Sequence, residues 1–317
     1  MTGTAESIVL GVAQIVVVVA VAPLFQGLIR KLKARFQSRN GPPLLQSYYD
    51  LGKLFSRGEM VADTASVIQL LAPWIVLGAV LSATLFVPMF AAATPLTRDG
   101  DLLLVVGLFA LARLALTLGG MDSGSSLGQM GSSRELAVGA LVEPAFLVSL
   151  GTLAIAAGTT QMAGIVVYGG IEGLGFVDLA WGLALLGFGI VTLAETGRIP
   201  VDNPDTHLEL TMIHEAMLIE YSGRSLGVLH LATMVKQLLL ACLMASLFFP
   251  FGLDQDPAAA SYVAGAGLLV VKVATIGLAL AIVESAFAKL RMYELPDLIG
   301  SASLVGLVAL AITVWQV

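Results

Sequence analysis

Long apolar stretches recur along the whole chain and are separated by short polar connections. About eight of them approach the length of roughly 20 residues that an α-helix needs to cross the hydrocarbon core of a bilayer. They run over 8–29, 66–90, 102–118, 136–158, 176–194, 227–250, 262–284 and 298–316. This pattern predicts an all-α polytopic membrane protein in which residues 1–317 form a single integral-membrane domain.

Charge sets the expected orientation of these spans. Only 12% of the residues are charged, and of the 16 Lys and Arg residues twelve fall in connections on one side of the predicted spans. Arg98 lies in a connection on the other side, and the remaining three lie inside spans. Because an excess of Lys and Arg marks cytoplasmic loops, we expect both termini outside and the chain in the cytoplasmic membrane of a bacterium or archaeon.

The connection between the first two spans is strongly basic. The run GPP at 41–43 breaks the chain after the cationic residues, and residues 44–55 are predicted to form a short amphipathic helix at the membrane interface. The basic residues set the topology and attract anionic headgroups. The connection is also longer than a link between two helices requires, which favours a docking surface for a cytoplasmic partner as well.

Most of the remaining polar residues lie between the fifth and sixth spans. Asn203 and Pro204 are an N-cap and a first-turn proline, and Gly223 is a stop signal, so an acidic helix is predicted from Pro204 to Ser222. Asp205, Glu209 and Glu220 would share one side of it. That side is either a solvated face or a surface that handles protons.

Several charged residues lie within the predicted spans or at their inner ends. They are Arg113, Glu143, Lys236 and Lys272, with Glu195 and Glu284 at the inner ends. A charge near the bilayer centre costs at least ~2.5–3.5 kcal/mol, so retained charges usually face the interior and have a role. Arg113 is near a helix end and is expected to snorkel toward the interface. Lys236 and Lys272 either neutralise Glu143 and Glu284 or take part in conduction.

Glu143 carries the strongest functional prediction. With the orientation above it lies ~10 Å inside the cytoplasmic boundary, too deep for a short side chain to snorkel. All of these charges fall in the inner half of the membrane, which predicts an ion path that starts at the cytoplasm and turns sideways into a neighbouring subunit. The single cysteine, Cys242, cannot supply an iron–sulfur or zinc site.

Three groups of motifs resemble those of one known family. The motifs are AETGRIPVD at 194–202 with EYSG at 220–223, QSRNGP at 37–42 with DLGKL at 50–54, and GSSRE at 131–135 with VEP at 142–144. Together they resemble the respiratory complex I subunit 1 family. The second and third groups are more similar to its hydrogenase branch, the membrane subunits of energy-converting NiFe hydrogenases of the formate hydrogenlyase subunit 4 and hydrogenase-4 component C type.

The resemblance implies a subunit that anchors a peripheral redox module and couples it to movement of protons or sodium ions. Partners would be hydrogenase large and small subunits, iron–sulfur subunits and antiporter-like membrane subunits. The NiFe centre and iron–sulfur clusters would lie in those partners, with no cofactor in this chain and no nucleic-acid partner. Candidate ion-pathway residues are Glu143, Glu195, Asp205, Glu209, Glu220, Lys236, Lys272 and Glu284. Candidate docking residues are Arg39, Asp50, Lys53, Arg134, Glu135, Arg198 and Asp202.

Two other functions stay open. The quinone-site subunit of NADH:quinone oxidoreductase belongs to the same family, but its corresponding loop is usually shorter and richer in glutamate, and His207 here stands where an acid is expected. A stand-alone secondary transporter is disfavoured, because the chain has no internal repeat and no pair of interrupted helices.

Overall fold

A computed structural model describes residues 4–62, 64–90, 100–172, 178–202, 212–252 and 259–316 of the chain. Its elements are α1 (Thr4–Phe36), α2 (Gln46–Phe55), α3 (Val67–Phe86), α5 (Leu102–Asp122), α6 (Ser126–Ala157), α7 (Met162–Glu172), α8 (Leu179–Glu195), α9 (His214–Leu218), α10 (Gly223–Leu243), the π-helical turn η2 (Met244–Phe248), α11 (Ala259–Ala286), the 3-10 turn η3 (Met292–Glu294) and α12 (Leu295–Gln316).

The predicted all-α membrane architecture is confirmed. Within the described ranges, seven helices are long and apolar enough to cross a membrane: α1, α3, α5, α6, α10 with η2, α11, and α12 with η3. The predicted span at 176–194 corresponds to α8, which is apolar but has 17 residues. The predicted interfacial helix is α2, whose Ser47 and Leu51 are buried while Tyr49 is exposed.

Two expectations about the connections are wrong. Residues 119–135, which the predicted spans leave as a connection, are mostly helical, since α5 continues to Asp122 and α6 already begins at Ser126, ten residues before the predicted span. The predicted helix from Pro204 to Ser222 begins outside the described residues and is not continuous, because residues 212 and 213 are not helical and α9 ends at Leu218. There the Asp202 carboxylate accepts the backbone N–H groups of Ile213 and His214, at 3.2 and 3.1 Å, and starts a new short helix.

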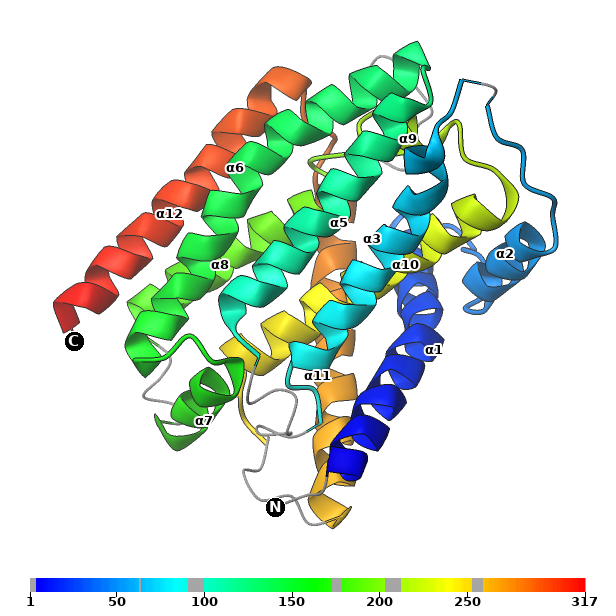
Figure 1. Ribbon diagram of the computed structural model, residues 1–317. Helices are drawn as coiled ribbons and strands as arrows, with labels where there is room; N and C mark the ends of the chain where they lie inside the picture. The colour runs from blue at the N-terminus through cyan, green and yellow to red at the C-terminus, as the bar shows by residue number, and fades with distance from the viewer. Residues whose placement is uncertain are drawn as a thin grey trace.

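Packing places α10 in the middle of the bundle, against α1, α2, α3 and α11, while α6 packs against α5, α8 and α12 (Figure 1). Four phenylalanines join these helices: the ring centroids of Phe109 and Phe146 are 6.0 Å apart, and Phe188 lies 5.4 Å from both Phe146 and Phe248. The aromatic contact ties α5, α6, α8 and η2 together next to the charged residues described below.

The connections gather at two ends of the bundle. At the end we call the basic face, the described residues are 37–62, 64–66, 196–202, 212–222 and 287–294. There the N–H of Met60 donates to Ser222 Oγ (2.8 Å) and the N–H of Leu290 to the carbonyl of Pro200 (2.9 Å). At the other end, Trp181 Nε1 donates to the carbonyl of Phe248 (2.9 Å). The N and C marks of Figure 1 lie away from α9, at that other end.

Candidate functional site

Arg113 is the centre of a buried ion-pair network. Its side chain, on α5, is 5% exposed, with Nε 3.3 Å from Glu135 Oε1 and Nη1 2.8 Å from Glu143 Oε1. Nη2 also donates to Glu195, at the end of α8. The expectation that Arg113 snorkels is therefore wrong, because three carboxylates on two neighbouring helices give the guanidinium a better environment than the interface would.

A glycine makes room for this arginine. Glu135, Gly139 and Glu143 are spaced four residues apart and so share one face of α6. A Cβ atom at Gly139 would lie 2.7 Å from Arg113 Nη1 and 2.8 Å from its Cδ. The absence of a side chain at Gly139 thus lets the Arg113 side chain come close to α6, where it contacts both glutamates.

Lys236 of α10 extends the network. Its Nζ lies 2.5 Å from Glu195 Oε2 and 5.8 Å from the centroid of the Phe109 ring. Glu195 therefore bridges Arg113 and Lys236. The expected pairing of Lys236 with Glu143 or Glu284 is not found, because the carboxylate it contacts is Glu195.

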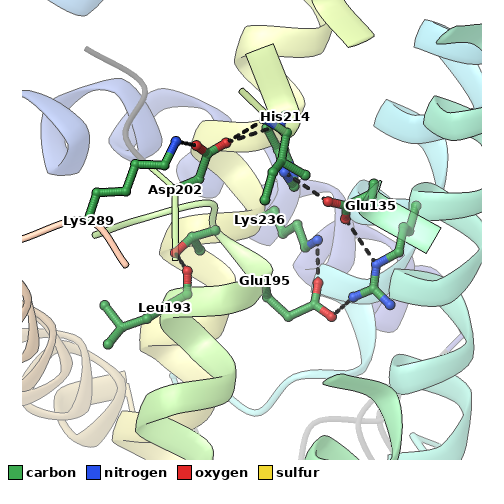
Figure 2. A network of polar contacts seen from close by, with 10 residues as sticks. Glu135, Leu193, Glu195, Asp202, His214, Lys236 and Lys289 are labelled. Carbon is green, nitrogen blue, oxygen red and sulfur yellow. Dashed lines mark hydrogen bonds and ion pairs between the residues drawn. The ribbon is translucent and has the colours of Figure 1, made fainter. Parts of the chain in front are cut away.

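The network reaches the basic face through His214. The imidazole Nδ1 lies 3.2 Å from Glu135 Oε2. Figure 2 shows the row of contacts that runs from Lys289 through Asp202 and His214 to Glu135, from which the Arg113 guanidinium leads to Glu195. Burial disfavours the imidazolium, but the charge of Glu135 and its hydrogen bond outweigh burial and raise the pKa of His214 above its ordinary value.

Asp202 fixes the position of His214. Besides accepting two backbone N–H groups at the start of α9, its carboxylate lies 2.7 Å from Lys289 Nζ. Arg134 Nη1 donates to the carbonyl of Met212, at 3.0 Å. The segment before α9 is thus held by a carboxylate from one side and a guanidinium from the other.

A second ion-pair group lies beside the first. Arg198 Nη1 lies 3.0 Å from Glu284 Oε1, and Lys33 Nζ lies 3.3 Å from Glu284 Oε2. Arg198 Nη2 donates to the amide oxygens of Gln237 (2.7 Å) and Gln26 (2.5 Å). Because Gln237 follows Lys236 on α10, this helix belongs to both groups.

Glu143 is the network member that reaches the outside of the bundle. Its side chain is 40% exposed, whereas that of Glu195 is 1% exposed. Leu136, Ala140 and Leu147 are exposed at spacings of seven, three and four residues from Glu143, so they share its outward side of α6. A half-exposed carboxylate in an apolar membrane-spanning face is costly when it faces lipid.

Lys272 has another environment. Its ammonium donates to the carbonyls of Phe249 and Phe251, at 2.6 Å for Phe251, just beyond the π-helical turn η2. Both carbonyls belong to residues that follow the last residue of η2 and lie outside any helix. Pairing of Lys272 with a glutamate is not what the structure shows, since Glu143 and Glu284 bind arginines.

The other predicted site residues are dispersed. Arg39 and Lys53 are exposed, Asp50 lies 3.8 Å from Arg30 on α1, and Arg134 is half-buried. Glu135, Arg198 and Asp202 are buried and make contacts within the chain, so any effect they have on a partner is indirect. Glu220 is half-buried and lies apart from the network, and Asp205 and Glu209 are outside the described residues.

Sequence reasoning missed the roles of His214, Gly139 and Gln237. A usable signal existed for two of them, because Gly139 lies midway between two intramembrane glutamates and Gln237 is a polar residue inside an apolar span. In the part of the chain that the structure describes, no group of three or more His, Cys, Asp or Glu side chains is arranged to hold a metal ion.

An apolar cavity of about 760 Å³ lies between α8 and α11, and its described lining residues are all uncharged. Among its described lining residues, Thr275 has the one polar side chain; others include Leu185, Leu193, Phe249 and Phe287. Such a lining suits hydrocarbon and offers few groups that would orient a polar ligand.

Comparison with known proteins places this geometry in a family. Residues 8–315 match the NADH dehydrogenase family. The chain is 34% identical to hydrogenase-4 component C of Escherichia coli K12 over 285 residues, which cover 90% of this chain and 89% of that protein. It is 32% identical to formate hydrogenlyase subunit 4 of the same organism over 289 residues, covering 90% and 92%.

The fold has a solved counterpart in the membrane-bound sulfane sulfur reductase, an archaeal respiratory membrane complex. The superposition has a TM-score of 0.86 at 22% identity and covers 97% of this chain and 99% of the matched chain. At this identity the likeness concerns the fold. With the family match spanning almost its whole length, the chain belongs to the NADH dehydrogenase family of integral membrane proteins, and its two hydrogenase-type relatives place it beside the membrane subunits of complex I-like complexes.

Proposed function

We propose that this chain is the membrane-anchor and ion-translocation coupling subunit of a membrane-bound hydrogenase related to complex I and similar to formate hydrogenlyase. The observation that carries the proposal is the position of Glu143, the outward end of a buried network whose other end, His214, lies at the basic face. The relatives named hydrogenase-4 component C and formate hydrogenlyase subunit 4 support the type of complex.

The network suits charge coupling better than simple conduction. The guanidinium of Arg113 contacts Glu135, Glu143 and Glu195 at the same time, so it joins the three carboxylates electrostatically without carrying protons between them. When one carboxylate takes up a proton, its hold on Arg113 weakens and the guanidinium is left closer to the others. A change of charge at Glu135 or Glu195 thereby changes the electrostatic interaction between Arg113 and Glu143.

Glu143 points to a neighbouring membrane subunit. Leaving a carboxylate against lipid costs at least ~2.5–3.5 kcal/mol near the bilayer centre, so a partner helix with polar or charged groups would cover it. An antiporter-like membrane subunit packed on the α5–α6 side fits this role. The ion would then continue sideways into that subunit.

The basic face would lie in the cytoplasm and bind the peripheral module. Its exposed residues Arg39 and Lys53 form the docking surface with Asp50 and with the half-buried Arg134 of α6, which contacts this face at Met212, while Glu135, Arg198 and Asp202 hold that surface in shape from within. The module would contain the hydrogenase large and small subunits and iron–sulfur subunits, which carry the NiFe centre and the clusters.

The test replaces Glu143 in the assembled complex. Glu143→Gln keeps an acceptor for Arg113 but cannot change charge, so we expect normal assembly and at least a tenfold lower ratio of ions moved to redox turnovers (about 1.4 kcal/mol per factor of ten). Glu143→Asp should keep part of the coupling, since the ionisable group survives on a shorter side chain. Glu172→Gln, an exposed glutamate at the end of α7, is the matched control.

Ion movement is followed in proteoliposomes with a pH-sensitive dye and, separately, with radioactive sodium. A Glu143→Gln complex that moves ions at the parental ratio would overturn the coupling role of Glu143. Mass spectrometry of the purified complex tests the partners: hydrogenase-type subunits support the proposal, whereas a quinone-reducing set or a homo-oligomer contradicts it.

A further inference from the structure

We propose that His214 is the group through which protons pass between the basic face and the buried ion-pair network. The proposal rests on the coupling function above and identifies where its network takes up and releases protons. Its basis is a contact between a partly exposed imidazole and a buried carboxylate.

Exposure falls stepwise along this route. The His214 side chain is 19% exposed, that of Glu135 is 6% exposed, and that of Glu195 is 1% exposed. His214 therefore touches both the outside and the network, while Glu135 and Glu195 are reached from the basic face only past other side chains. A group that exchanges protons needs this double access.

The backbone is built to keep the imidazole in place. A Cβ atom at Gly131 would lie 2.8 Å from Ala216 Cβ and 3.0 Å from the carbonyl of Ile213, so a glycine is required for α9 to pack this closely on α6. Gly197 has φ +58°, and a Cβ there would be 3.3 Å from His214 Cγ. Gly131 thus lets α9 pack on α6, and Gly197 lets the chain after α8 pass close to the imidazole.

Charge balance gives His214 a reason to be protonated. The buried network has the two cations Arg113 and Lys236 against the three carboxylates of Glu135, Glu143 and Glu195, which leaves one negative charge. An imidazolium at His214 makes the group neutral, and loss of its proton restores the negative charge. The raised pKa of His214 agrees with this arrangement.

The groups that face His214 come from several elements. Glu135 of α6 and Asp202, which precedes α9, favour the imidazolium, whereas Lys236 of α10 opposes it. Arg113 of α5 lies behind Glu135, at 3.3 Å from its carboxylate. A change in the charge of any of these groups during turnover would therefore change the pKa of His214.

The transfer step is a simple proton exchange. The imidazolium gives the proton on Nδ1 to Oε2 of Glu135, which leaves a neutral imidazole and a neutral carboxylic acid. The reverse step returns the proton to Nδ1, and the ring exchanges its proton with water or with the partner at the basic face. The carboxylates of Glu135, Glu143 and Glu195 all contact the Arg113 guanidinium, so a metal cation would have to compete with this arginine for them.

The experiment compares two histidines in the complete complex. His214→Asn keeps a donor where Nδ1 lies but cannot titrate, and we expect the number of protons moved per redox turnover to fall at least about tenfold. His230→Asn is the control, because His230 is also a half-buried histidine, lies on α10 and is influenced by Arg30 and Asp50 outside the network. This control should keep the parental ratio.

Chemical rescue separates proton exchange from a structural role. In His214→Ala, added imidazole should restore proton movement with a pH dependence set by the added base, and it should do nothing for Glu143→Gln. If His214→Ala does not assemble, His214→Asn is judged by whether the pH profile of proton movement loses the titration seen in the parent.

Three results would overturn the inference: parental proton movement in His214→Asn, no rescue of an assembled His214→Ala complex, or an equal loss in His230→Asn. Failure of this inference is distinguishable from failure of the proposed function. If His214→Asn behaves as the parent while Glu143→Gln is uncoupled, the coupling function stands and proton exchange at His214 is wrong. If both behave as the parent, the coupling function itself is wrong.

Discussion

Gly131 and Glu135 lie one helical turn apart on α6, and the first brings α9 close enough for the second to pair with His214. The GSSRE motif that contains both residues therefore places a glycine, which lets another helix approach closely, and a carboxylate on the same face of α6. Contact between α6 and α9 is what joins the basic face to the charges inside the bundle.

Substitution at Gly131 should separate these elements. In Gly131→Ala the new Cβ meets Ala216 and backbone atoms that cannot move without shifting α9, so we expect a loss of about 1–3 kcal/mol of stability and a weaker His214–Glu135 contact. The melting temperature of the purified chain would fall, and so would the number of ions that the complex moves per redox turnover. Gly151→Ala on the same helix is the control, because its Cβ would meet one side-chain atom at 3.9 Å. Equal behaviour of the two variants would contradict the close-packing role.

Stability should depend on pH through His214. Since its folded-state pKa is raised, the folded chain binds the proton more tightly than the unfolded chain, whose histidine titrates near 6.5. The stabilisation is then complete below about pH 6.5 and is lost as the pH rises through the raised pKa. The melting temperatures of the parent and of His214→Asn, measured between about pH 5.5 and pH 9, should converge as the pH rises. A gap that widens with rising pH would contradict the assignment.

Single cysteines can test the orientation of the basic face. Gly58 and Gly170 lie at opposite ends of the bundle, both are exposed, and a Cβ at either would meet nothing within 4 Å. In a Cys242→Ser background, an impermeant thiol reagent added outside intact cells should label Gly170→Cys but should label Gly58→Cys only after permeabilisation. Labelling of both from the same side would contradict the bundle geometry, and the reverse pattern would contradict the cytoplasmic assignment.

The spans themselves could be predicted from the sequence, because burial in lipid demands an apolar stretch of a certain length whatever its neighbours are. The start of α6 could not. Residues 126–135 are rich in glycine and serine and read as a connection, yet they are helical and pack on α5 and α9. Their glycines are required by close approach of other elements, which is a property of the assembled bundle.

The same distinction holds for the charges. The sequence by itself determined that Glu143, Lys236 and Arg113 lie inside spans and that their cost demands partners. It did not determine which partners, because helical periodicity gives the side of a helix a residue is on but not which helix lies opposite. Arg113 meets carboxylates 30 and 82 residues away in the chain. His214 of α9 meets Glu135, a further partner of Arg113, from beyond the membrane spans. Only the tertiary structure brings these groups within hydrogen-bonding distance, since the packing of α5, α6, α8 and α10 decides which faces meet.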